Sequence, residues 1–135
     1  MIENFQAEST SAGNEFEDTV EKHLSLTGNV IEKNYVVQDT GVEVDFLASN
    51  VGVDGKVRLE LVEAKGGRPG DKKRPGAERT DNVKKAVANG AILKFLDPSL
   101  YYVVYFSAPP KPDSYADHML RVALQANYID EIRYI

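Results

Sequence analysis

Hydrophobic and polar residues follow each other along the chain with two different periods, which predict alternating helices and strands. Phe16, Val20 and Leu24 form an apolar stripe at helical spacing, and Gly28 can end that helix. Asp54-Gly55 is typical of a hairpin turn. The predicted elements are a helix over 13–24, strands over 29–38, 42–48 and 56–65, a helix from 78–81 to 96, a strand over 101–107, a helix over 114–127 and a short strand over 129–135.

The order of these elements predicts an α/β fold. The first three strands can form an antiparallel meander, whereas the helix before the fourth strand provides a crossover that sets strands three and four parallel. We therefore expect a three-layer α/β/α arrangement around a mixed sheet of four to five strands. The length of 135 residues suits a single domain spanning residues 1–135, and the polar residues 1–12 are expected to be flexible.

Composition narrows the class of protein. Hydrophobic residues make up 42% of the chain, as in ordinary soluble proteins, and we find no bilayer-spanning run and no signal-peptide pattern. We expect a cytoplasmic protein without a membrane partner. Because the chain has no cysteine, disulfides, thiolate metal sites and thiol catalysis are excluded, and two histidines leave little for a histidine-rich zinc site.

Charged residues stand at the ends of two neighbouring apolar strands. Asp45 lies in the run 42–48, and Glu63 and Lys65 close the run 56–65. Because side chains alternate along a strand, Glu63 and Lys65 share a face, and Asp45 can meet them from the neighbouring strand. Charges in such apolar surroundings are costly unless they pair with each other or hold a cation.

With these residues in this element order, the chain resembles the PD-(D/E)XK superfamily of restriction-endonuclease-like nucleases. Asp45 matches the first acid of the motif, Glu63-Ala64-Lys65 matches the (D/E)XK tripeptide, and Glu17 matches an acidic position on the first helix. Val44, not proline, precedes the first acid. The resemblance implies a restriction-endonuclease-like core.

The same resemblance implies a metal-dependent endonuclease that hydrolyses phosphodiester bonds in DNA. Asp45, Glu63 and the backbone carbonyl of Ala64 would hold Mg²⁺ or Mn²⁺, and carboxylate oxygens suit such hard ions. Lys65 would orient or deprotonate the attacking water, and Glu17 would bind a second ion or a metal-bound water. A homodimer is expected, because cutting two strands needs two sites.

The segment 65–85 carries eight basic and three acidic residues, although the whole chain has a net charge of −5. Its glycine- and proline-rich loop over 66–76 is either a solvated tip or an arm that contacts a nucleic-acid backbone, and its position after Lys65 favours the arm. The expected nucleic-acid-binding residues are Arg68, Lys72, Lys73, Arg74, Arg79, Lys84 and Lys85, of which the last two also suit a solvated helix face.

Each candidate residue has a simpler explanation. Glu63 and Lys65 could form a strand-end ion pair of little worth. Asn14 with Glu17 fits a helix capping box, and Glu43 is a rival first acid, although a solvated edge position suits it better. Packing alone would explain a second group of residues, namely His23 at the edge of the core and Tyr101, Tyr102 and Tyr105 in their strand.

Three other functions compete with a general DNA endonuclease. The first is a structure-selective enzyme resembling junction resolvases, which would act on branched DNA. The second is a nucleic-acid-binding module that keeps the fold without catalysis. The third is a structural or regulatory domain.

Overall fold

The computed structural model describes residues 2–66 and 75–135, with side chains from residue 15 onward. The helices are α1 (Ile2–Thr27), α2 (Thr80–Leu96) and α3 (Tyr115–Gln125), and a 3₁₀ turn, η1 (Gly76–Glu78), precedes α2. The strands are β1 (Gly28–Val37), β2 (Val42–Val51), β3 (Val57–Lys65), β4 (Tyr102–Phe106) and β5 (Glu131–Tyr134).

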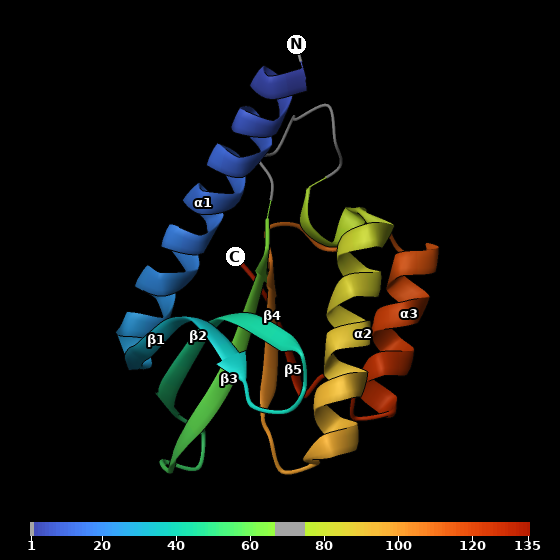
Figure 1. Ribbon diagram of the computed structural model, residues 1–135. Helices are drawn as coiled ribbons and strands as arrows, with labels where there is room; N and C mark the ends of the chain where they lie inside the picture. The colour runs from blue at the N-terminus through green and yellow to red at the C-terminus, as the bar shows by residue number, and fades with distance from the viewer. Residues whose placement is uncertain (1, 67–74) are drawn as a thin grey trace.

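The strands form one open, mixed sheet in the order β1-β2-β3-β4-β5. β1, β2 and β3 pair antiparallel, whereas β4 runs parallel to β3 and β5 runs parallel to β4. α1 covers one face of this sheet, and α2 and α3 cover the other (Figure 1). The predicted α/β class, meander and parallel crossover are confirmed.

The first helix differs from its prediction. α1 begins at Ile2 instead of Gly13, so Asn14 lies inside the helix and the predicted capping box is wrong. The apolar stripe that signalled this helix starts only at Phe16, but residues 2–12 contain neither glycine nor proline to interrupt it. The flexibility expected for residues 1–12 stays a prediction.

Two hydrophobic clusters fill the space between the three layers. On the α1 side, the predicted stripe of Phe16, Val20 and Leu24 packs against Phe46 of β2 and Val62 of β3. The cluster on the other side joins α2 and α3 to the opposite face of the sheet and includes Leu61, Val83, Ala86, Leu93, Tyr102, Val104 and Leu120. All five residues of β4 are buried, as expected for a strand covered on both faces.

Gly90 allows α2 to approach the segment between α3 and β5 closely. α2 continues through this glycine to Leu96. A Cβ atom at position 90 would lie 2.1 Å from the backbone oxygen of Tyr128, so only glycine permits this contact. The helix is thereby held close to the backbone that leads from α3 to β5.

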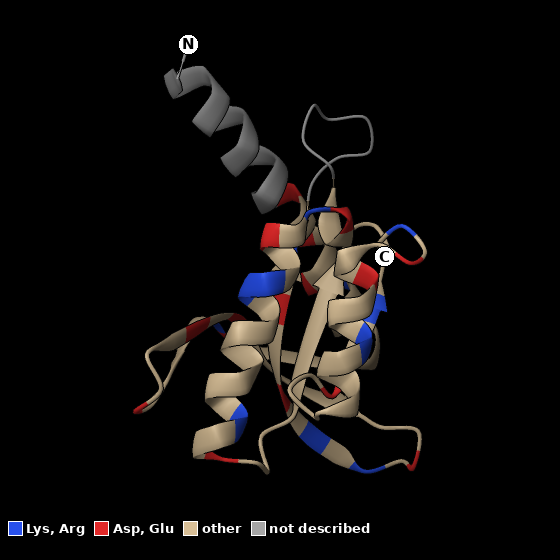
Figure 2. Ribbon diagram, turned by 90° about the vertical axis from the view of Figure 1, so that its right-hand side faces the viewer, with Lys and Arg blue, Asp and Glu red and all other residues tan. Residues whose placement is uncertain are grey.

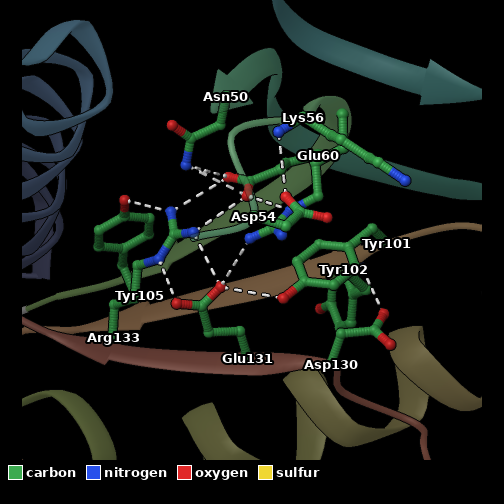
Figure 3. Close-up of polar contacts among 11 residues, drawn as sticks. Asn50, Asp54, Lys56, Glu60, Tyr101, Tyr102, Tyr105, Asp130, Glu131 and Arg133 are labelled. Atoms are coloured by element: carbon green, nitrogen blue, oxygen red, sulfur yellow. Dashed lines mark hydrogen bonds and ion pairs between the residues drawn. The ribbon is translucent and has the colours of Figure 1, made fainter. Parts of the chain in front are cut away.

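A buried charged network, which the sequence did not indicate, joins β2, β3, β4 and β5 (Figure 3). Glu60 is fully buried, and Arg133 donates to both of its carboxylate oxygens, at 3.1 and 3.0 Å. Arg58 Nε donates to the same carboxylate at 3.1 Å, and the Asn50 amide donates at 3.2 Å. These donors compensate the buried charge and tie β5 to the β2–β3 hairpin.

The same network extends to α1 through a tyrosine. Arg133 donates to the hydroxyl of Tyr105 at 2.7 Å, and a hydrogen bond of 3.0 Å joins that hydroxyl to Nδ1 of His23. Tyr101 donates to Glu131 at 3.1 Å. His23 and these two tyrosines therefore do more than fill space, because they connect the helix to a polar cluster within the core.

Arg133→Met should destabilise the protein by about 3–5 kcal/mol, because it removes the principal partner of a buried carboxylate. Arg121→Met is the matched control, since Arg121 forms an exposed pair with Asp117 at 2.8 Å and its loss should cost less than about 1 kcal/mol. Urea unfolding of both variants measures the difference. Similar losses in the two variants would contradict a stabilising role for the network.

Candidate active site

The candidate site lies where β2 separates from β3. The two strands pair from Val51 to Phe46, and the register ends at the Phe46–Val62 pair. Asp45 comes next, and its Oδ2 accepts a hydrogen bond from the N–H of Ala64 at 2.7 Å. The Asp45 carboxylate thus takes the place of a backbone partner at the point where the ladder stops.

The bend in β2 is visible in how its residues pack. Val44 belongs to the hydrophobic cluster on the α2 side, whereas Phe46, two residues later, belongs to the cluster on the α1 side. In a straight strand these two side chains would share a face. β2 therefore turns near Asp45, and that turn opens the sheet beside Ala64.

Glu63 is buried at the base of this opening, with 4% of its surface exposed. Asn89 of α2 donates from Nδ2 to Oε1 of Glu63 at 3.2 Å. Within the described part of the chain, the other oxygen, Oε2, is buried without a hydrogen-bond partner. Nζ of Lys65 lies 3.8 Å from it, close enough for an ion pair but not for a hydrogen bond.

The surroundings of Glu63 disfavour its charge. Burial raises the pKa of this carboxyl, Lys65 opposes that effect, and the negative charge of Asp45 raises the pKa further. Smaller lowering effects come from the hydroxyl of Tyr102 and the amide of Asn89. The site therefore holds a carboxylate whose charge is disfavoured mainly by burial, and a bound cation would relieve that cost.

Glu17 reaches the same place from α1. Its pKa is raised by partial burial, and then by repulsion from Asp45 and a hydrogen bond with that carboxyl, while Lys65 acts in the opposite direction. A helix cap no longer explains Glu17, because α1 extends well beyond it toward the N-terminus. The structure thus brings together Glu17, Asp45, Glu63 and Lys65, the four residues expected to be catalytic.

The residues present fit a divalent ion held by two carboxylates. Among residues 2–66 and 75–135, no three acidic or histidine side chains converge closely enough to hold one metal. Mg²⁺ commonly takes only one or two carboxylates and keeps several waters, so Asp45 and Glu63 suffice. The buried, unpartnered Oε2 of Glu63 is the observation that favours a cation here. Roles for Glu17 and the Ala64 carbonyl stay predictions.

The expected nucleic-acid contacts are placed only in part. Lys84 and Lys85 are exposed, and they lie toward the N-terminal end of α2, where Figure 2 shows a basic band. Since α2 runs opposite to β3, this end lies beside the end of β3 that carries Lys65 (Figure 1). Arg79 precedes the helix. Arg68, Lys72, Lys73 and Arg74 lie outside the described residues. The rival acid Glu43 is exposed on β2, in keeping with the predicted solvated position.

Asn89 and Tyr102 are the site residues that sequence reasoning missed. Tyr102 is fully buried and donates to the backbone oxygen of Ala86 at 3.2 Å. Burial raises its pKa well above the ordinary value, and the nearby Glu63 adds to this effect. The available signal was Asn89 itself, a polar residue next to the apolar stripe of α2.

Comparison with protein-family models, with curated proteins and with solved structures finds no match to this chain. Among the described residues, none of the helices combines the length and the apolar character that crossing a membrane requires.

Glu63→Gln should stabilise the folded protein by about 1 kcal/mol near pH 7, because it removes a buried charge. The pKa of Glu63 is raised on folding, so the folded state binds more protons than the unfolded state above about pH 4, and wild-type stability falls as the pH rises through that window. The gain should shrink as the pH is lowered toward 4, where both states are protonated.

Thermal unfolding of wild type and variant between pH 4 and 8, without divalent ions, measures this effect. Glu43→Gln is the control, because Glu43 is exposed on the same strand as Asp45 and its replacement should leave stability nearly unchanged. A loss of stability in Glu63→Gln at neutral pH would show that the Lys65 pair outweighs the burial of the carboxylate.

Proposed function

We propose that this protein is a metal-dependent DNA endonuclease with a restriction-endonuclease-like core. One observation carries the proposal: Asp45, Glu63 and Lys65 lie at the opening between β2 and β3, where Glu63 keeps a buried oxygen that has no hydrogen-bond partner among the described residues. Perturbed carboxylates beside a lysine are typical of catalytic sites. The sheet order and the helix on each face are also compatible with such a core.

Each residue then has a defined task. Asp45 and Glu63 would hold Mg²⁺ or Mn²⁺, which supplies charge stabilisation to the phosphate and lowers the pKa of a bound water. Lys65 lies 3.8 Å from Glu63 and is 22% exposed, so it would orient the attacking water and offset the charge that develops on the phosphate. Glu17 would hold a proton or a water beside Asp45.

DNA would approach the end of the sheet that carries Lys65. Lys84 and Lys85 are exposed on α2 at that end, and phosphate contacts there need no base-specific geometry. Two strand cuts require two such sites, so a homodimer would act on duplex DNA. A non-catalytic nucleic-acid-binding module is the second candidate, favoured by the 3.8 Å approach of Lys65 to Glu63, which is also compatible with a simple ion pair.

A plasmid-nicking assay with Mg²⁺ or Mn²⁺ tests catalysis directly. Asp45→Asn and Glu63→Gln should each weaken Mn²⁺ binding in titration calorimetry by at least about tenfold and abolish nicking, because each removes a charged ligand. Lys65→Ala should leave Mn²⁺ binding largely intact but reduce nicking by about 100-fold or more, since lysine cannot ligate the ion. Metal-independent nicking would contradict the metal dependence, and no nicking by the wild type would contradict an endonuclease.

A double substitution tests the path of the DNA. Lys84→Ala with Lys85→Ala should weaken binding similarly for unrelated duplexes and flatten the slope of log affinity against log salt by roughly two units, near 0.9 per lost phosphate contact. Lys22→Ala with Lys56→Ala is the charge-matched control, because both lysines are exposed but lie on α1 and before β3. Equal changes in the two double variants, measured by fluorescence anisotropy, would place the DNA elsewhere.

A further inference from the structure

In each of the two carboxylates at the site, Asp45 and Glu63, one oxygen already accepts a hydrogen bond from the protein. Oδ2 of Asp45 accepts from the backbone N–H of Ala64 at 2.7 Å. Oε1 of Glu63 accepts from the amide of Asn89 at 3.2 Å. One oxygen of each carboxylate is therefore engaged, and Oε2 of Glu63 is the one left without a partner among the described groups.

The donor to Glu63 is held in place from both sides. One turn before Asn89, the hydroxyl of Tyr102 donates to the backbone oxygen of Ala86 at 3.2 Å. Directly after it, Gly90 lies so close to Tyr128 that an added Cβ would approach that residue's oxygen to 2.1 Å. α2 therefore has little freedom to slide along the sheet, and the amide of Asn89 is fixed over Glu63.

This arrangement has a consequence for the choice of cation. A carboxylate with both oxygens available can bind in a bidentate manner, which suits Ca²⁺ with its six to eight ligands at about 2.3–2.6 Å. Mg²⁺ requires nearly octahedral coordination at about 2.0–2.1 Å and takes carboxylate oxygens singly. A donor that engages one oxygen of Glu63 thus opposes Ca²⁺ more than Mg²⁺.

We propose that Asn89 is a positioning residue that makes the site select small octahedral cations. By engaging Oε1 it restricts Glu63 to single-oxygen ligation through Oε2, as the backbone N–H of Ala64 does for Asp45. This inference rests on the proposed function in that it takes Asp45 and Glu63 as the metal-binding pair. The donor to Asp45 is a backbone N–H, which a substitution cannot remove. The donor to Glu63 is the side-chain amide of Asn89, which a substitution can remove.

The test is a comparison of cation affinities. Asn89→Leu keeps the approximate volume of the side chain but removes the donor, and Asn89→Ala serves as a second variant if the first fails to fold. Asn82→Leu is the matched control, because Asn82 lies on the same helix and donates to the backbone oxygen of Gly76 at 3.0 Å. Titration calorimetry with Mg²⁺, Mn²⁺ and Ca²⁺ is carried out on each protein in the absence of DNA.

The ratio of Ca²⁺ to Mg²⁺ affinity should rise by about tenfold in the Asn89 variants and stay within about twofold of wild type in Asn82→Leu, in keeping with the usual effect of groups that orient metal ligands. A loss of packing alone would weaken all three cations together. An unchanged ratio in Asn89 variants that still bind Mn²⁺ would overturn the inference while leaving the proposed endonuclease intact.

Failure of the proposed function gives a different pattern. A shifted ratio in a protein that never nicks DNA would support the selectivity role of Asn89 and contradict the endonuclease. A wild-type protein that binds none of the three cations would overturn both.

Discussion

The candidate site depends on the separation of β2 from β3 after the Phe46–Val62 pair. A backbone N–H at such a place would lose its ladder partner, and a carboxylate is a strong acceptor for it. Asp45 accepts the N–H of Ala64, so the strands can part without leaving that donor unsatisfied. The opening lets Glu17 from α1 approach Asp45, so acids from a helix and two strands meet there.

Two buried glutamates on β3 differ in how fully their carboxylates are hydrogen-bonded. Glu60 is surrounded by two arginines and an asparagine, which satisfy both of its oxygens and link three strands. Glu63, three residues later and on the opposite face, has one amide partner and a lysine at 3.8 Å. A fully satisfied cluster stabilises the fold, whereas a partly satisfied carboxylate stores unfavourable energy that binding can release.

The helix α2 connects these features to the rest of the molecule. Its buried face packs on β4, and Gly90 lies against the backbone of Tyr128. Asn89, on the same helix, donates a hydrogen bond to Glu63. The lysines on its exposed side lie at the same end of the sheet as Lys65. A single element therefore orients a candidate metal ligand from within and presents positive charge outside.

The sequence by itself determined the elements that local patterns encode. The strand runs, the Asp54-Gly55 turn and the crossover helix predicted the antiparallel meander of the first three strands and the parallel pairing of the third and fourth, since periodicity and turn chemistry act between near neighbours. The place and direction of β5 were not predicted. Asp45, Glu63 and Lys65 were found for the same reason, because charged residues at the ends of apolar strands stand out in the pattern.

Only the tertiary structure decided which distant groups meet. Arg133 and Glu60 are 73 positions apart, and Asn89 and Glu63 are 26 apart, so no local period links either pair. The start of α1 at Ile2 also escaped prediction, because the apolar stripe that signalled this helix in the sequence begins only at Phe16. Side-chain hydrogen bonds across layers depend on how helices dock, and docking is settled by the packing of the whole core.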